Sequence, residues 1–324
     1  MKKTLAIFAA FCIISMTACF SPWDGSGDQG TIVIDLGNGG ARAADGDVYT
    51  VLLNSGETSI SKTTTGGVAS FSVQPGLWNI LVRRADINGN LKSFGKTDVE
   101  VQAGAIASAS IVMGKVTQTV ETWDALKGLF GNNDGKNEIV VIAQDLSANS
   151  SINFQDEKIR WNITLLAEKD VTITKTTAID NSLFRVLAGC ELTLDGTGGG
   201  NITISGGGLG HSSLVLVENG KLIMYDGVTL TNNSISSKNF DTRGGGVTVD
   251  KGTFTMNGGT ISGNSAQSGG GVRILSGTFT KNGGTIYGSN GGNNKNTASN
   301  KGHAVYYDSS KKSIDKTLGP GDKL

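Results

Sequence analysis

Four carboxylate residues in the C-terminal half of the chain have a spacing that could support chemistry. Asp195 and Asp226 each follow a short apolar run, and Glu218 and Asp250 end two others. If successive runs stack as neighbouring strands, the rungs lie about 4.8 Å apart and each pair brings two carboxylates within about 5 Å. That distance suits the two acids of a retaining glycosidase or the oxygen ligands of a calcium ion.

Each of these carboxylates also lies at a glycine-rich turn, where acidic residues are expected simply as solvated corner residues. No arginine recurs beside them, because Arg243 and Arg273 stand alone in the sequence. The only histidines are His211 and His303, and neither forms a recognisable pairing motif with Cys190. We therefore assign no catalytic or metal residue, and keep the four carboxylates as candidates for an enzyme or a calcium binder.

An internal repeat must position these residues. Gly244 recurs as Gly269 and Phe254 recurs as Phe279, which is a spacing of 25 residues. A period of roughly 20 to 50 residues indicates stacked repeats. The first copy holds three short glycine-bounded pieces, GVTVD, GTFTM and GTIS. Three short strands per copy without a helix predict a parallel β-helix of roughly six turns, and rungs about 4.8 Å apart make it a rod of about 30 Å.

The repeat also predicts which side chains point inward. The expected columns are Val215–Val247–Val272, Val217–Val249–Ile274, Leu222–Phe254–Phe279 and Leu230–Ile261–Ile286. Asn233 and Asn264 fall at a matching turn, where stacked amides can bond from rung to rung. Lys281 stands where earlier copies have Met224 and Met256, so we expect its stem along the edge of a partly open last coil. NNKNTASNKG is predicted to be a loop, and HAVYYDSS a strand that closes the far end.

Residues 31–114 show a different pattern, with short alternating runs punctuated by Gly, Asn and Pro, which predicts a β-sandwich. Its expected core is Ile32, Ile34, Tyr49, Val51, Leu53, Phe71, Val73, Trp78, Ile80 and Val82. Next comes TVETWDALKGLFG, which predicts a short helix with Thr119 as N-cap and Gly131 as its stop. We expect this helix to cover the first open end of the stacked strands, because an exposed edge invites aggregation.

The chain begins with a basic pair and the apolar run Leu5–Met16, then Thr17-Ala18-Cys19. This predicts a secretory signal that is too short to span a bilayer. Of the three cysteines, Cys12 leaves with the signal, and Cys19 and Cys190 remain. The chain has 28 basic and 28 acidic residues, and removing two signal lysines leaves 26 − 28 = −2. We expect no nucleic-acid partner, because that would need a clustered basic face.

Ala18-Cys19 resembles the lipobox of bacterial lipoproteins, with Met16 where that family prefers Leu. The resemblance implies that residues 1–18 are removed and that Cys19 carries acyl chains. Cys190 is then alone, so no intrachain disulfide is expected. Residues 19–30 are polar and rich in glycine, which predicts a tether. Phe20 rather than Asp follows the cysteine, which by the same resemblance favours the outer membrane. The alternative is an ordinary signal peptide that is cut nearby, with Cys19 incidental.

Two further resemblances concern the folded parts. TTGGVASFSVQPGLWNILVRRADING resembles carboxypeptidase-regulatory-like and collagen-adhesin B-type domains, at Gly67, Phe71, Pro75, Gly76 and Trp78. This implies a transthyretin-like sandwich that often serves as a stalk. SGNSAQSGGGVRI resembles the repeats of polymorphic outer membrane proteins, and residues 119–310 resemble right-handed parallel β-helix proteins of the pectate-lyase-like class. Enzymes of that class use clustered aspartates, with calcium in the lyases, but fold alone does not fix function.

Together these patterns predict an all-β, lipid-anchored cell-envelope protein, surface-exposed on the outer membrane, with residues 311–324 as a C-terminal tail. Its predicted role is adhesion, binding of a glycan or host matrix protein, or surface scaffolding. The alternative is a polysaccharide lyase or hydrolase acting on an acidic glycan. No cofactor is expected unless the carboxylates hold calcium.

Overall fold

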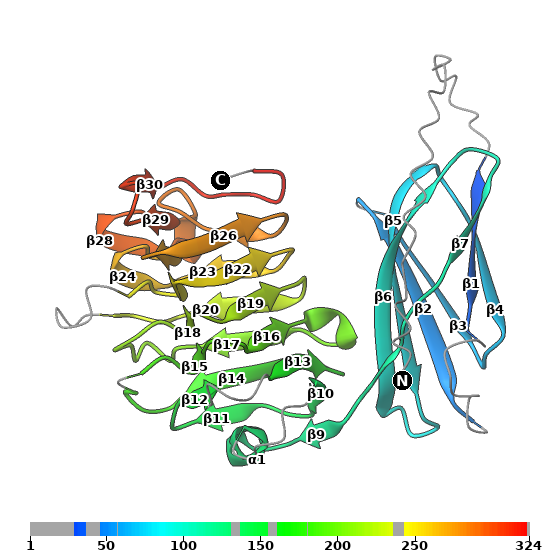
Figure 1. The fold of residues 1–324 in the computed structure, drawn as a ribbon, viewed down its shortest axis with the longest axis horizontal. Coiled ribbons are helices and arrows are strands. Elements are labelled where there is room, and N and C mark those ends of the chain that lie inside the picture. The colour runs from blue at the N-terminus through cyan, green and yellow to red at the C-terminus, as the bar shows by residue number, and fades with distance from the viewer. Residues whose placement is uncertain are drawn as a thin grey trace, which may run out of the picture.

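A computed structural model describes residues 29–36, 46–56, 58–130, 137–154, 161–179, 181–235 and 243–322. The described chain is all-β in character, with long parallel sheets and one short α-helix (Figure 1). The predicted signal, Cys19, the tether up to Asp28 and Gly131 lie outside the described residues. No helix in the described part of the chain combines the length and apolar character needed to cross a membrane.

Two sheets share the N-terminal core, with strand orders β4-β1-β7 and β3-β2-β5-β6-β8. Alternation explains the buried face: in β4, VASFSV turns Ala69, Phe71 and Val73 inward and the residues between them outward. All ten core residues predicted from the sequence are buried together, which confirms that prediction. The strands are β1 (Gly30–Asp35), β2 (Val48–Ser55), β3 (Thr58–Thr64), β4 (Val68–Val73), β5 (Gly76–Ala85), β6 (Leu91–Val101), β7 (Ile106–Ala109) and β8 (Gly114–Lys115).

The helix α1 (Trp123–Leu129) begins later than predicted. Thr119 as N-cap is wrong, because that residue lies in β9 (Gln118–Val120) and pairs with β10 (Asn137–Ile142). Thr122 is the N-cap instead, and its hydroxyl accepts a hydrogen bond from the Ala125 N–H at 3.1 Å. Trp123 meets the Phe184 ring edge-on at 5.7 Å, so α1 covers the first end of the coil's core as predicted.

The rest of the chain coils through three sheets in turn, and each circuit adds a parallel strand to each sheet (Figure 1). Sheet 1 has β9, β10, β13 (Asn162–Ala167), β16 (Glu191–Leu194), β19 (Lys221–Met224), β22 (Gly252–Met256) and β26 (Gly277–Lys281). Sheet 2 has β11 (Leu146–Ala148), β14 (Val171–Lys175), β17 (Ile202–Ser205), β20 (Val228–Thr231), β23 (Thr260–Ser262) and β27 (Thr285–Ile286). Sheet 3 has β12 (Ile152–Phe154), β15 (Phe184–Val186), β18 (Val215–Glu218), β21 (Val247–Asp250), β25 (Val272–Ile274), β29 (Val305–Tyr307) and β30 (Lys312–Ile314).

Like side chains stack over like along this coil, and the four predicted inward columns are confirmed. The rings of Phe254 and Phe279 are nearly parallel, with centroids 4.8 Å apart. The predicted asparagine ladder is also present and is longer than expected. The Asn233 N–H donates to Asn264 Oδ1 at 3.1 Å, and the Asn264 N–H donates to Asn296 Oδ1 at 2.9 Å. Glycine allows the backbones of neighbouring coils to approach closely where the chain turns. At Gly227, where φ is +74°, a Cβ atom would meet the backbone of Gly196 in the preceding coil.

The far end is more ordered than the sequence suggested. The prediction that NNKNTASNKG is a loop is wrong in part. Strand β28 (Thr297–Lys301) pairs in parallel with β24 (Ser265–Ser268), and the two form a small sheet outside the other three. The segment after residue 310 is not a separate tail. Strand β30 pairs antiparallel with β29, and Leu318 is buried in the coil's core and exchanges backbone hydrogen bonds with Ile286.

Candidate functional site

Asp195 lies at the corner after β16 and is almost fully buried. Its carboxylate forms an ion pair with Lys96 of β6 at 2.6 Å and accepts the Thr197 N–H at 3.0 Å. Lys96 Nζ also lies 2.9 Å from the centroid of the Tyr225 ring. Burial lowers the pKa of Lys96 and outweighs the opposing effect of Asp195. The environment of Asp195 is therefore that of a buried ion pair rather than of an acid in an open cleft.

The same region joins the N-terminal sheets to the coil. Leu81, Leu91 and Phe94 of β5 and β6 pack against Val141 and Leu166 on the outer face of sheet 1. The Lys96–Asp195 pair sits beside this apolar contact and satisfies two charges that the contact would otherwise bury unpaired. This arrangement gives Asp195 a structural role.

Asp226 lies one coil further on. The Gly196 N–H donates to the Asp226 carbonyl oxygen at 3.0 Å, so Asp195 and Asp226 occupy neighbouring corners as the sequence predicted. Their carboxylates nevertheless have different partners. Asp226 Oδ1 accepts the Gly259 N–H at 3.3 Å, whereas the Asp195 carboxylate binds Lys96. Both carboxylates act on Lys96 electrostatically, but only Asp195 forms an ion pair with it.

Glu218 and Asp250 are direct neighbours in the register of sheet 3, as predicted. Glu218 forms an ion pair with Arg185 at 2.6 Å, and Asp250 accepts the Ser276 hydroxyl at 3.0 Å. Arg243 lies close enough for both carboxylates to raise its pKa, although burial has the larger effect and lowers it. The prediction that Arg243 stands alone is therefore wrong.

Arg273 is not isolated either, because it forms an ion pair with Asp308 at 3.0 Å. Sheet 3 thus carries acids and arginines that neutralise one another along its outer face. Among the described residues, no group of three or more His, Cys, Asp or Glu side chains could hold a metal ion.

The outer face of sheet 2 is different, and the sequence analysis missed it. Its strands place a hydroxyl at every outward position of two adjacent columns, which we call the hydroxyl face. The signal was present as Thr or Ser at alternate positions of VTIT, ITIS, VTLT and TIS. The columns are Thr172–Thr203–Thr229–Thr260–Thr285 and Ser147–Thr174–Ser205–Thr231–Ser262.

No charged side chain interrupts these two columns, although both other sheets of the coil carry charges on their outer faces. Sheet 1 has the ion pair between Glu191 and Lys221 at 2.8 Å, and sheet 3 has the arginine pairs. Neighbouring rungs lie about 4.8 Å apart, and alternate residues along a strand about 6.6 Å apart. Nine of the ten hydroxyl residues are at least partly exposed, and Ser262 is 8% exposed. The exposed Asp145 lies at the start of the first column, where its carboxylate accepts the Thr172 N–H at 2.7 Å. Beyond Asp145, the hydroxyl face is an uncharged array of donors and acceptors.

One further charged residue was not anticipated. Lys175 ends β14 at an inward position of sheet 2 and is almost fully buried beside Ala148 in the register. Burial lowers the pKa of its ammonium to about 8. In VTITK the first, third and fifth residues share one face of the strand, so the alternation already placed Lys175 on the inward face. The sequence analysis did not predict this, because lysine is normally exposed.

Comparisons with protein-family models, with curated proteins and with solved structures found no match for this chain. Its function must therefore be argued from its own residues and their arrangement.

Proposed function

We propose that this protein is a lipid-anchored component of the bacterial cell envelope that displays a right-handed parallel β-helix on a transthyretin-like sandwich. The β-helix binds an uncharged glycan through the hydroxyl face of sheet 2. The observation that carries the binding role is the run of ten hydroxyl side chains in two unbroken columns.

The chemistry of the hydroxyl face fits a neutral sugar polymer. Each Thr or Ser hydroxyl can donate one hydrogen bond and accept others, as the hydroxyls of a sugar can. Threonine is restricted at χ1, so its hydroxyl is held in place before a ligand arrives and loses little entropy on binding. A repeating polymer can meet a repeating surface many times, so that weak contacts add up.

The absence of charge on those strand positions argues for a neutral ligand rather than an acidic one. An acidic polysaccharide would be expected to select basic side chains, and the arginines of sheet 3 already have acidic partners. The four candidate acids are likewise engaged in other bonds. These contacts favour a binding surface over a lyase or hydrolase.

The anchor rests on the sequence around Cys19, where several acyl chains would give stable membrane attachment. Metabolic labelling with a palmitate analogue tests it directly. We expect the label on the wild-type protein and its loss on Cys19→Ala. Label retained on that variant would contradict the anchor.

A glycan and matrix-protein array probed with the whole mature chain tests the binding role. We expect binding to neutral polysaccharides that is lost on Thr229→Lys, which places a charge in the middle of the hydroxyl face. Thr255→Lys, on the outer face of β22 in sheet 1, is the matched control and should leave binding unchanged. Binding confined to matrix proteins, or cleavage of uronic-acid polymers, would overturn the proposal.

A further inference from the structure

The far end of the coil closes two of its three sheets but leaves sheet 1 open. Sheet 2 ends with backbone hydrogen bonds between Ile286 and Leu318, and sheet 3 ends with β30 on β29. Sheet 1 ends at β26, and no strand of the described chain pairs with the outer edge of β26. An edge of this kind presents unpaired N–H and C=O groups that can template another strand.

The backbone of β26 shows which groups face that edge. The Asn282 N–H donates back to the Met256 carbonyl of β22 at 2.8 Å. In a parallel ladder, alternate residues send their backbone groups to opposite neighbours. The peptide groups of Phe279 and Lys281 therefore point away from β22, toward the open edge.

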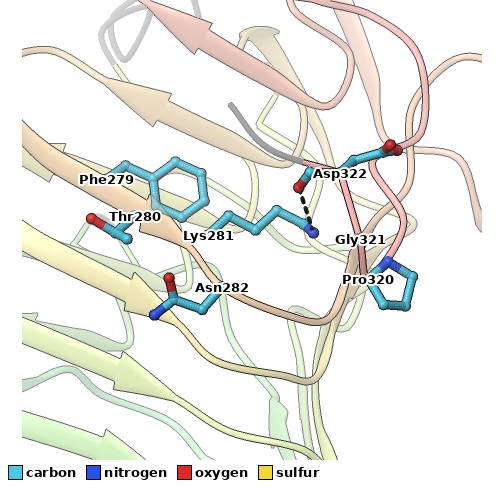
Figure 2. Close-up of a pocket in the computed structure, with 7 residues that line it drawn as sticks. All are labelled: Phe279, Thr280, Lys281, Asn282, Pro320, Gly321 and Asp322. Atoms are coloured by element: carbon cyan, nitrogen blue, oxygen red, sulfur yellow. Dashed lines mark hydrogen bonds between the residues drawn. The ribbon is translucent and has the colours of Figure 1, made fainter. Parts of the chain in front are cut away.

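A cavity of about 590 Å³ lies along this edge (Figure 2). Four consecutive residues, 279 to 282, form one wall, and the segment Pro320–Asp322 forms the other. Successive residues of a strand point to opposite faces of a sheet. A cavity lined by all four must follow the edge of the strand, where an added strand would lie, rather than cover one face.

Lys281 places a positive charge in this cavity. Lys281 is only 6% exposed, and its Nζ donates to the carbonyl oxygen of Gly319. It also donates to the carbonyl oxygen of Asp322, as Figure 2 shows. An ammonium has three donors, so these two bonds leave one for a ligand. No carboxylate in the described chain lies within ion-pair distance of Lys281. Burial lowers the pKa of Lys281, and the Asp322 carboxylate, on the other wall of the cavity, opposes that effect only in part.

We propose that the open edge of β26 binds an extended acidic segment of a partner protein, which adds to sheet 1 as one more parallel strand. The partner's main chain pairs with the peptide groups of Phe279 and Lys281. An apolar side chain lies over Phe279 and continues the Phe254–Phe279 stack. Two residues later, a carboxylate lies over Lys281 and supplies the charge that this column lacks. The site is independent of the hydroxyl face and of the proposed glycan binding.

A peptide derived from the chain's own strand β22 can serve as the probe for this edge. An acetylated, amidated and fluorescently labelled peptide with the sequence of residues 251–262 carries Glu in place of Met256, and a matched peptide carries Lys there. Anisotropy titration with the mature protein should show saturable binding, at least tenfold tighter for the Glu peptide. Lys281→Met should abolish the preference for Glu, and its unfolding midpoint shows whether the variant is folded. Lys281→Pro removes an edge donor that the pairing with β22 does not use, and should abolish binding of both peptides.

Equal affinity for the two peptides, or no binding of either, would overturn the proposal. So would hydrogen exchange at the amides of Phe279 and Lys281 in the free protein that is as slow as at Thr280, because the edge would then already be paired. Sedimentation velocity tests whether a second copy of this chain binds at the edge instead of a partner protein. Self-association that is lost on Lys281→Pro would assign the edge to this chain itself and not to a partner.

Discussion

Replacing Lys175 by Met should stabilise the protein, because the wild-type chain buries an ammonium group there. Burial lowers the pKa of Lys175 from its ordinary value of 10.5 to about 8. Each tenfold loss of proton affinity corresponds to about 1.4 kcal/mol, so the protonated side chain costs the folded state about 3 kcal/mol at most. Methionine has a similar length and keeps the contacts of the lysine stem, so the gain at pH 7 should be about 1–3 kcal/mol.

The dependence on pH has a definite sign. Below about pH 8 the group is protonated in both states and the whole penalty applies. Between about pH 8 and 10.5 the unfolded chain binds a proton that the folded chain does not, so the free energy of unfolding rises with pH. The advantage of Lys175→Met over wild type should therefore shrink as the pH rises through this window.

Urea unfolding of wild type and variant at pH 7, 8, 9 and 10 measures both effects through midpoint and slope. Lys301→Met, which alters an exposed lysine of β28, is the control and should follow wild type at every pH. Comparison with wild type cancels the contributions of other titrating groups. A variant that is no more stable at pH 7, with a difference from wild type that does not change between pH 8 and 10, would refute the reasoning.

Three further changes test the packing and the ion pair. Asn264→Ala should cost about 2–4 kcal/mol because it leaves several buried backbone groups unsatisfied, whereas Asn282→Ala in the exposed amide pair should cost under about 0.5 kcal/mol; equal losses of urea midpoint would contradict the ladder. Lys96→Met should cost about 2–4 kcal/mol by leaving the Asp195 carboxylate buried without its cation, and a double-mutant cycle with Asp195→Asn should show coupling rather than additivity. Phe254→Ala should cost about 3–5 kcal/mol in thermal or urea unfolding, and a loss below about 1 kcal/mol would show that the column is not tightly packed.

The inward face of the coil could be predicted because the repeat itself encodes the register. When consecutive copies pair in parallel, position 254 of one copy must meet position 279 of the next, and the side chain repeats with the backbone. The same logic found Asn264 as the partner of Asn233. It missed Asn296, because that residue lies in NNKNTASNKG, a stretch that has no counterpart in the earlier copies of the repeat.

Contacts between residues far apart in the chain could not be predicted in this way, because no pattern in the sequence marks them. Lys96 and Asp195 are 99 residues apart and belong to different sheets, so neither the period nor local composition predicts their pairing. The helix cap was misplaced for a local reason. Thr119 and Thr122 are both acceptable N-caps by type, and pairing of β9 with β10 keeps Thr119 in a strand. The hydroxyl face was overlooked because outward threonines also suit strands for their β-branching alone, and only the register shows that they align.

The three outer faces of the coil are chemically distinct, and this bears on where a ligand can bind. Sheet 1 holds the N-terminal sheets through Val141 and Leu166, and sheet 3 is crossed by paired charges such as Arg185 with Glu218. A ligand on either face would have to displace a contact or an ion pair that the protein already makes. On the hydroxyl face it would meet no ion pair between the strands, and its own hydroxyls could replace the bonds that water makes to exposed Thr and Ser side chains. The two ends of the coil also differ. Helix α1 covers the first end, whereas at the far end β26 has one edge without a paired strand. Binding is therefore expected at sheet 2 and at β26. Thr229→Lys should abolish glycan binding and leave peptide binding unchanged, whereas Lys281→Met should abolish the preference for the Glu peptide and leave glycan binding unchanged.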